Sequence, residues 1–131
     1  MILLDTCAII WDALDQRQLS PKAKTAIDRA DQNNALVVSD ISIWEVAMLI
    51  KKGRIEIETT AATFFNLILQ SRNISVIQIS PEIAELSTHF GPEISNDPAD
   101  RVISATSVIH NAQLVTADKK LLNCELIDTL W

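Results

Sequence analysis

Residues 1–14 read MILLDTCAIIWDAL, and this stretch decides the fold class. Its first apolar run, Ile2 to Leu4, is too short for a helix and is bounded by Asp5, which predicts a strand buried on both faces. From residue 6 onward the apolar side chains recur at helical spacing. A short buried strand that passes directly into a helix is typical of α/β proteins with a parallel sheet.

The rest of the chain repeats this alternation of short apolar runs and helical patterns. Further strands are predicted at residues 36–38, 74–79 and 113–116, with a weaker fifth candidate at 124–127. Helices are predicted at residues 6–14, 21–33, 41–52, 61–72, 81–90 and 100–111. We therefore expect an α/β fold in which helices flank both faces of a central, mostly parallel sheet of four to five strands. No linker or repeat divides the chain, so residues 1–131 are expected to form a single domain.

The composition narrows the functional classes. The chain has 131 residues, of which 48% are hydrophobic, enough for a core without metal or disulfide support. Its 17 acidic and 11 basic residues give a formal net charge of −6, which argues against a protein that binds nucleic acid by broad electrostatic attraction. An enzyme that acts on nucleic acid is still compatible with this charge, because carboxylates that hold divalent cations make the bare chain more acidic than the loaded protein.

The cysteines and the apolar segments indicate the cellular compartment in which the protein is expected. Cys7 and Cys124 are the only cysteines, and they have neither the spacing of a zinc site nor the density of a disulfide scaffold. A reducing cytoplasm is the simplest expectation. The first apolar stretch is interrupted by Asp5 and carries no basic leader, so we expect no signal peptide. No apolar run reaches the roughly 18 residues needed to span a membrane.

Acidic residues follow several of the predicted strands. Asp5 and Asp118 come just after two apolar runs, while Glu45 and Asp100 lie in the first turns of predicted helices. Ligands of open parallel sheets bind beyond the carboxyl ends of the strands, where these residues are expected to converge. Asp40 also follows a strand, but with Ser39 it is interpreted as a helix cap.

Each acid taken alone is more often a helix cap or a solvated turn residue than a ligand. Glu45 is the exception, because it lies between apolar neighbours where an unpaired carboxylate would be costly to desolvate. Asp97 precedes a proline and is interpreted as a turn former or as an acceptor that supports a ligand. The joint pattern of four separated acids is what favours a shared site.

Four blocks of the sequence together carry a family resemblance. They are Met1-Ile2-Leu3-Leu4-Asp5-Thr6-Cys7, Ser42-Ile43-Trp44-Glu45-Val46-Ala47, Asp97-Pro98-Ala99-Asp100-Arg101-Val102-Ile103-Ser104-Ala105-Thr106 and Leu114-Val115-Thr116-Ala117-Asp118-Lys119-Lys120-Leu121. In this order and spacing they resemble the signature blocks of PIN-domain ribonucleases, in particular the VapC-like toxins of toxin-antitoxin pairs.

The resemblance implies a function and a set of site residues. Asp5, Glu45, Asp100 and Asp118 match the acidic quartet that gathers Mg²⁺, or Mn²⁺ in its place, for hydrolysis of RNA phosphodiester bonds by a metal-activated water. Thr6, Thr116 and Asp97 match positions that support such ligands. The resemblance also implies a homodimer and a cognate antitoxin as partner.

The chemistry agrees with this interpretation. Carboxylate oxygens suit Mg²⁺ or Mn²⁺ better than zinc, and such cations stabilise the charge that develops on phosphate oxygens. No protein nucleophile is then needed. His89 and His110 are expected to be surface or helix-end residues, and Cys7 a small core filler, because it has no basic neighbour.

The basic residues give weaker signals for RNA contacts. Lys119 and Lys120 follow Asp118, where they could meet phosphate. A second basic group comprises Lys51, Lys52 and Arg54, which could contact RNA or simply complement the dipole at a helix carboxyl end. Arg101 is expected to pair with a neighbouring carboxylate.

Large apolar side chains crowd two of the predicted helices. The first carries Ile9, Ile10, Trp11 and Leu14, and the fourth carries Phe64, Phe65, Leu67 and Ile68. They could form a dimer interface or simply cover the core. Trp11 and Trp44 are likewise expected to be core or interface residues.

Two alternative functions stay open. A phosphohydrolase with Asp5 as covalent nucleophile normally needs a second acid two residues later, where this chain has Cys7. A PIN-like module retained only for protein interaction would be marked by loss of one of the four acids, and none is lost.

Overall fold

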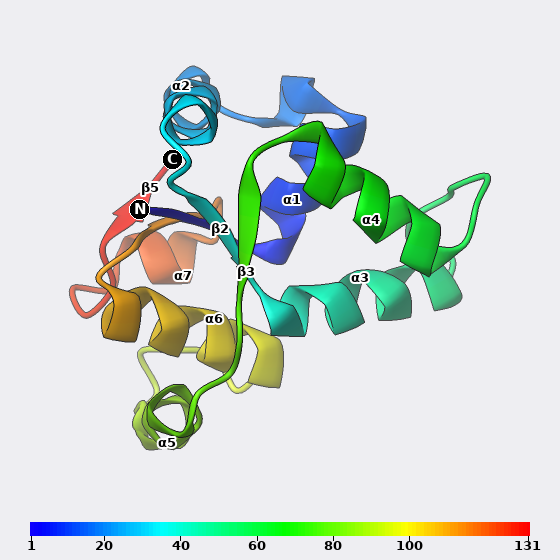
Figure 1. The fold of residues 1–131 in the computed structure, drawn as a ribbon. Helices are drawn as coiled ribbons and strands as arrows, with labels where there is room; N and C mark the ends of the chain where they lie inside the picture. Colours follow the sequence, from blue (N-terminus) through cyan, green and yellow to red (C-terminus); the bar gives the residue numbers. More distant parts are fainter.

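The computed structural model describes residues 1–131 as a five-stranded parallel sheet surrounded by helices (Figure 1). The strands lie in the order β3-β2-β1-β4-β5. Their bounds are β1 Ile2–Leu4, β2 Leu36–Ser39, β3 Ile74–Ile77, β4 Gln113–Val115 and β5 Thr129–Leu130. The helices are α1 Thr6–Leu14, η1 Gln16–Gln18, α2 Pro21–Gln32, α3 Asp40–Lys51, α4 Ala61–Ser71, α5 Pro81–His89, α6 Pro98–His110 and α7 Lys119–Leu122.

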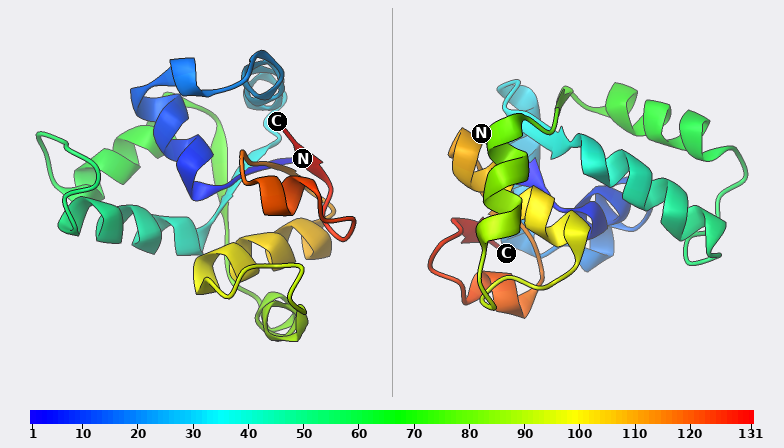
Figure 2. Two further views of the ribbon diagram at one scale, coloured as in Figure 1. Left: turned by 180° about the vertical axis from the view of Figure 1, so that it is seen from behind. Right: turned by 90° about the horizontal axis from the view of Figure 1, so that it is seen from below.

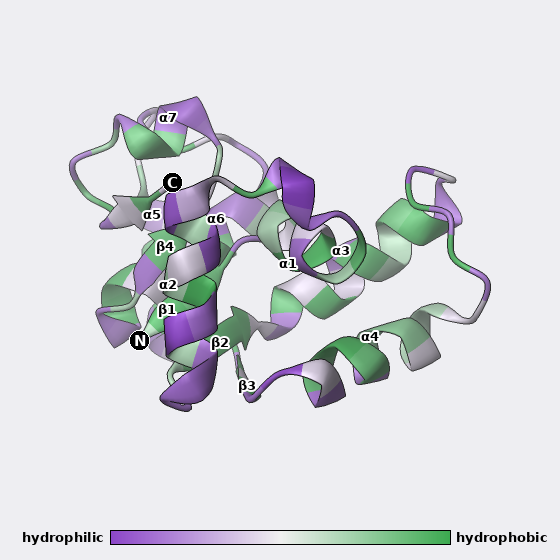
Figure 3. Cartoon of the chain, turned by 90° about the horizontal axis from the view of Figure 1, so that it is seen from above, coloured by the Kyte–Doolittle hydropathy of each residue, from purple (hydrophilic) through white to green (hydrophobic).

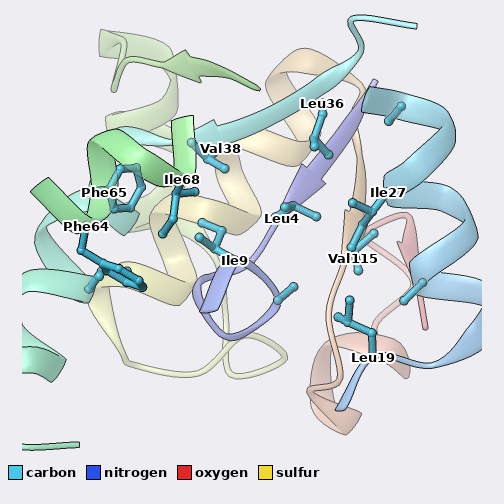
Figure 4. Packing of buried hydrophobic residues seen from close by; sticks show 14 residues of the cluster. Leu4, Ile9, Leu19, Ile27, Leu36, Val38, Phe64, Phe65, Ile68 and Val115 are labelled. Atoms are coloured by element: carbon cyan, nitrogen blue, oxygen red, sulfur yellow. The ribbon is translucent and has the colours of Figure 1, made fainter. Parts of the chain in front are cut away.

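The central strand β1 divides the core in two, because successive side chains of a strand point to opposite faces. Leu4 faces a cluster built with α1, α2 and α4, whose members include Ile9, Ile27 and Phe65 (Figure 4). Leu3 faces the other cluster, which α6 and α7 cover. Helices therefore flank both faces of the sheet, as predicted (Figures 1 and 2).

Serine residues cap the amino-terminal ends of α2 and α5. Ser20 accepts a hydrogen bond from the backbone N–H of Ala23, and Ser80 accepts one from Ile83, each with proline at the first helical position. None of the helices is long and apolar enough to cross a membrane.

The carboxyl-terminal strand was placed wrongly from the sequence. Residues 124–127 form a turn, and β5 is Thr129–Leu130 instead. Cys124 and Ile127 are buried in the second cluster, so their apolar character signalled burial rather than extended backbone. Two elements were also missed, the short helices η1 and α7, and α6 begins two residues before the predicted start at residue 100.

The helices α3 and α4 pack side by side and project from the sheet, joined by a loop at their far end (Figures 1 and 3). The near end of α3 begins directly at the carboxyl end of β2. This arrangement places Glu45, the sixth residue of α3, near the edge of the sheet where the other predicted site residues lie.

Candidate active site

The sheet register brings the ends of three strands together. Leu4 of β1 pairs with Val38 of β2 and with Val115 of β4. Asp5 follows Leu4 directly, and its backbone N–H donates to the carbonyl of Val115 at 3.2 Å. The carboxyl ends of the three central strands thus meet around Asp5, as parallel pairing requires.

Asp5 is the most deeply placed of the acids. Its Oδ1 caps α1 by accepting from the N–H of Ala8 at 2.8 Å. Burial raises the pKa of Asp5 to about 6, with repulsion from Asp100 and Glu45 adding to the shift. Hydrogen bonding from the Thr116 side chain and the Ala8 N–H opposes the increase in pKa but does not cancel it.

Glu45 approaches from α3. Its side chain is half-buried, and this burial raises its pKa. The Thr6 hydroxyl lies close enough to the Glu45 carboxylate to lower that pKa, whereas the charges of Asp97 and Asp100 raise it further. The Glu45 carboxylate therefore lies within electrostatic reach of Asp97 and Asp100.

Asp100 and Asp118 complete the group. Ser95 Oγ donates to Asp100 Oδ2 at 2.8 Å, and burial with repulsion from Asp97 and Asp118 raises the pKa of Asp100. Asp118 caps α7 through its Oδ1, which accepts from Lys120 N–H at 2.8 Å. One carboxylate oxygen of each residue is left without a hydrogen bond from the protein.

The four acids predicted from the sequence therefore share one region. Asp5 interacts electrostatically with Asp100 and Glu45, and Asp100 interacts with Asp118. Desolvation raises the pKa of Cys7 on α1, and the charges of all four acids raise it further. Four segments of the chain thus contribute one carboxylate each to the carboxyl edge of the sheet.

The donor chemistry of this region fits a hard divalent cation. The carboxylates repel one another, and oxygen donors of this kind are those that Mg²⁺ and Mn²⁺ prefer. In the arrangement described, no three His, Cys, Asp or Glu side chains lie together in a geometry that could hold a metal ion. The carboxylates would therefore have to reorient to bind one.

Buried hydroxyl groups lie beneath the acids. Thr116 is fully buried, and its Oγ1 accepts from the N–H of Asp118 at 3.1 Å. Thr6 is also buried, and its Oγ1 lies 3.0 Å from Ser42 Oγ. Sequence reasoning gave Ser42 no role, although its position three residues before Glu45 puts both side chains on neighbouring parts of the same helix surface.

Asp97 caps α6 by accepting from the N–H of Asp100 at 3.0 Å, so it contacts the backbone of one of the four predicted ligands. Asp40 differs from expectation. Ser39 alone caps α3, and Asp40 is the first residue of that helix, with its Oδ2 accepting from the N–H of Ile79 at 3.2 Å. Asp40 Oδ1 is buried without a hydrogen-bond partner.

The basic residues lie at two places. Lys119 and Lys120 are exposed beside Asp118, and Lys51, Lys52 and Arg54 are exposed at the carboxyl end of α3. None of them forms an ion pair. The expectation for Arg101 was wrong, because its guanidinium donates to the backbone carbonyls of Ser87 and Phe90 rather than to a carboxylate.

Two further expectations need correction. Cys7 is exposed on α1 rather than a core residue. Trp44 is 55% exposed on α3, so it is not a core residue, and its place in an interface stays a prediction. Trp11 packs against the first core cluster and against Trp131, with ring centroids 5.7 Å apart. His89 and His110 are exposed residues at the ends of α5 and α6, as predicted.

Comparisons with known proteins agree with the geometry. Over 120 residues the chain is 31% identical to Ribonuclease VapC22 of Mycobacterium tuberculosis, covering 92% of this chain and 88% of that protein. The fold is similar to VapBC2 from Rickettsia felis bound to a promoter DNA fragment, with a TM-score of 0.73, 17% identity, and coverage of 99% of this chain and 98% of that chain. A toxin-antitoxin complex from Klebsiella pneumoniae matches with a TM-score of 0.67 and 24% identity, covering 100% of this chain and 97% of that chain. Residues 2–125 match the PIN domain family, and the chain therefore belongs to that family.

Proposed function

We propose that this protein is a divalent-metal-dependent endoribonuclease that acts as the toxin of a toxin-antitoxin pair. The observation that carries the proposal is the convergence of Asp5, Glu45, Asp100 and Asp118 at one edge of the sheet. The charges of Asp100 and Glu45 raise the pKa of Asp5, and the charge of Asp118 raises the pKa of Asp100. The relative named as a ribonuclease is 31% identical to this chain over 120 aligned residues, which supports RNA as substrate.

In this proposal the four carboxylates hold Mg²⁺, or Mn²⁺ in its place. A bound divalent cation supplies Lewis-acid stabilisation of charge on phosphate oxygens and acidifies water. Thr6, Thr116 and Asp97 orient the ligands: Thr6 lies against Glu45, Thr116 holds the backbone of Asp118, and Asp97 holds that of Asp100. The free oxygens of Asp100 and Asp118 face no protein donor and are available to a cation.

The basic residues contribute to RNA binding in this proposal. Lys119 and Lys120 are the best placed, because they flank Asp118 and are exposed. Lys51, Lys52 and Arg54 would extend contact along the backbone of the RNA. With a net charge of −6, the chain depends on such local positive groups rather than on its overall field.

An antitoxin is the proposed protein partner, as in the complexes that share this fold. A groove of about 350 Å³ between α3 and α4 offers an apolar surface for it. Its lining includes Ile43, Ala47, Phe65 and Leu69. An arginine of the antitoxin could pair bidentately with the site carboxylates and so exclude the metal.

We also propose a homodimer, although fewer apolar residues are free to form its interface than the sequence suggested. Four of the eight apolar residues expected on the two helices, Ile9, Phe64, Phe65 and Ile68, are buried in the core of the single chain. Leu14 and Leu67 are 49% and 55% exposed and are available for an interface. Cys7 and Cys124 form no disulfide, as is usual for proteins of the reducing cytoplasm. We propose that the protein acts there, where it would encounter RNA and an antitoxin.

The test of the proposed function is RNA cleavage by the purified protein. Single-stranded RNA should be cut with Mg²⁺ or Mn²⁺ and left intact in excess chelator, and co-expression with the product of a neighbouring gene should suppress the cleavage. Full activity in chelator would overturn the metal-dependent mechanism. If no neighbouring product binds or inhibits, the toxin role falls while the nuclease assignment stands.

A further inference from the structure

A pair of buried hydroxyl groups joins the two helices that carry Asp5 and Glu45. Thr6, on α1, follows Asp5 directly, and Ser42, on α3, precedes Glu45 by three residues. Thr6 Oγ1 and Ser42 Oγ lie 3.0 Å apart, and the two residues are 5% and 0% exposed. Both hydroxyls are shielded from bulk water, so leaving either one unpaired would be costly and the hydrogen bond between them is favoured.

The direction of this hydrogen bond follows from counting protons. Each hydroxyl has one proton to donate, and an ionised carboxylate only accepts. The Thr6 hydroxyl acts on Glu45 as a hydrogen-bonding neighbour. If Thr6 gives its proton to Glu45, its oxygen is free only to accept, and Ser42 must be the donor to Thr6.

Ser42 has no competing hydrogen bond. A serine or threonine within a helix often donates to a backbone carbonyl of the preceding turn, as Ser87 of α5 donates to Ala84 and Thr106 of α6 donates to Val102. Ser42 makes only the contact with Thr6. Its hydroxyl is therefore committed to the neighbouring helix.

We propose that Ser42 is a positioning residue of the site, whose hydroxyl donates to Thr6 Oγ1 and thereby holds the Thr6 hydroxyl toward the Glu45 carboxylate. This inference rests on the proposed function and deepens it by adding a residue to the support of one metal ligand. Groups that orient a metal ligand typically change metal affinity by 10- to 100-fold when removed. Loss of the Ser42 hydroxyl should therefore weaken Mn²⁺ binding by about 10-fold.

A double-mutant cycle tests whether Ser42 acts through Thr6. Mn²⁺ affinity is measured by calorimetry for the wild type, Ser42→Ala, Thr6→Val and the double variant. Each single variant should bind about 10-fold more weakly, and the double variant should be no weaker than Thr6→Val. Thr6→Ser, which keeps the hydroxyl, should bind as the wild type does. Wild-type affinity in Ser42→Ala, or losses that multiply in the double variant, would overturn the proposal.

A matched control separates this role from simple packing. Ser104 of α6 is also fully buried, but its Oγ has no hydrogen-bond partner. Ser104→Ala should leave Mn²⁺ affinity unchanged. An equal loss of affinity in Ser104→Ala would show that any buried serine has this effect and would refute the assignment of Ser42.

A second readout needs neither metal nor RNA. In the metal-free protein, the exchange of the Thr6 hydroxyl proton with water, followed by NMR, should be slow in the wild type and at least 10-fold faster in Ser42→Ala. Unchanged exchange would contradict the proposal. If the wild type failed to bind Mn²⁺ at all, the proposed function would fall, while hydroxyl exchange would still decide the role of Ser42.

Discussion

Asp12 and Arg72 lie 60 residues apart in the sequence and are joined by two hydrogen bonds, from Nε to Oδ2 at 2.7 Å and from Nη2 to Oδ1 at 2.9 Å. Both side chains are largely buried, at 10% and 14% exposure. Arg72 also contacts Asp28 and Asp31 of α2. One guanidinium at the end of α4 thus holds α1 and α2 to the start of β3.

Removing the Asp12 carboxylate should destabilise the fold strongly. Asp12→Ala leaves Arg72 buried without its bidentate partner, and we expect a loss of about 3 kcal/mol in the free energy of unfolding. Asp28 is 46% exposed in its contact with Arg72, so Asp28→Ala should cost less than about 1 kcal/mol. Urea denaturation of the two variants measures both values. Equal losses would contradict the special role of the bidentate pair.

The stability of the metal-free protein should depend on the protonation of Asp5. Its pKa is about 6 in the folded protein against an ordinary value of 3.8, so the folded state retains the proton to higher pH than the unfolded chain. The resulting destabilisation is absent below about pH 4, grows as the pH rises through 6, and reaches about 2 to 3 kcal/mol above that.

Asp5→Asn should therefore stabilise the metal-free protein at pH 7 and have little effect at pH 4. Asparagine can still accept from the Ala8 N–H, so the cap of α1 is kept. Thermal melting in chelator at the two pH values gives the comparison. A variant that melts below the wild type at pH 7 would show that Asp5 carries no such penalty.

The thiol of Cys7 should be slow to react although it is exposed. Although the residue is exposed, partial desolvation of its thiol, with the charges of Asp5 and the other acids, raises the pKa of Cys7 to about 11, and only the thiolate is nucleophilic. Alkylation of a Cys124→Ser variant at pH 8 should run at least 10-fold slower than that of free cysteine. A rate equal to that of free cysteine would contradict the raised pKa.

Much of the fold was predictable because short buried strands and capped helices are local features. The run Ile2–Leu4 and the Ser20-Pro21 pair each carry their own signal. The grouping of the four acids could be predicted for a related reason. Parallel strands bring their carboxyl ends to one edge of the sheet, however far apart the strands are in the sequence. The sequence therefore predicted where Asp5, Glu45, Asp100 and Asp118 would lie.

Other features depend on contacts that no local pattern encodes. The partners of Arg72 come from α1 and α2, more than 40 residues away, and the hydrogen bond from Ser42 to Thr6 joins two helices. The wrong prediction for the fifth strand has a different cause, because an apolar pattern predicts burial but does not distinguish a buried strand from a buried turn. Cys124 and Ile127 are as buried as strand residues, but a turn buries them.

Divalent cation should stabilise the folded protein, because binding relieves the repulsion among the carboxylates. Millimolar Mg²⁺ or Mn²⁺ should raise the melting temperature at pH 7 by several degrees. Asp100→Asn should abolish most of this increase, since Asp100 interacts with Asp5, Glu45 and Asp118. An undiminished increase in that variant would place the cation elsewhere.

The most direct measurement is the rate of RNA cleavage in saturating Mn²⁺ for Asp100→Asn and for the control Asp40→Asn. Asp40 also follows a strand, β2, near the same edge of the sheet, but it is not one of the four acids of the proposed site. We expect Asp100→Asn to lose at least two orders of magnitude in rate, with unchanged circular dichroism, and Asp40→Asn to stay within about threefold of the wild type. Wild-type cleavage by Asp100→Asn would contradict the proposal that these four carboxylates form the active site.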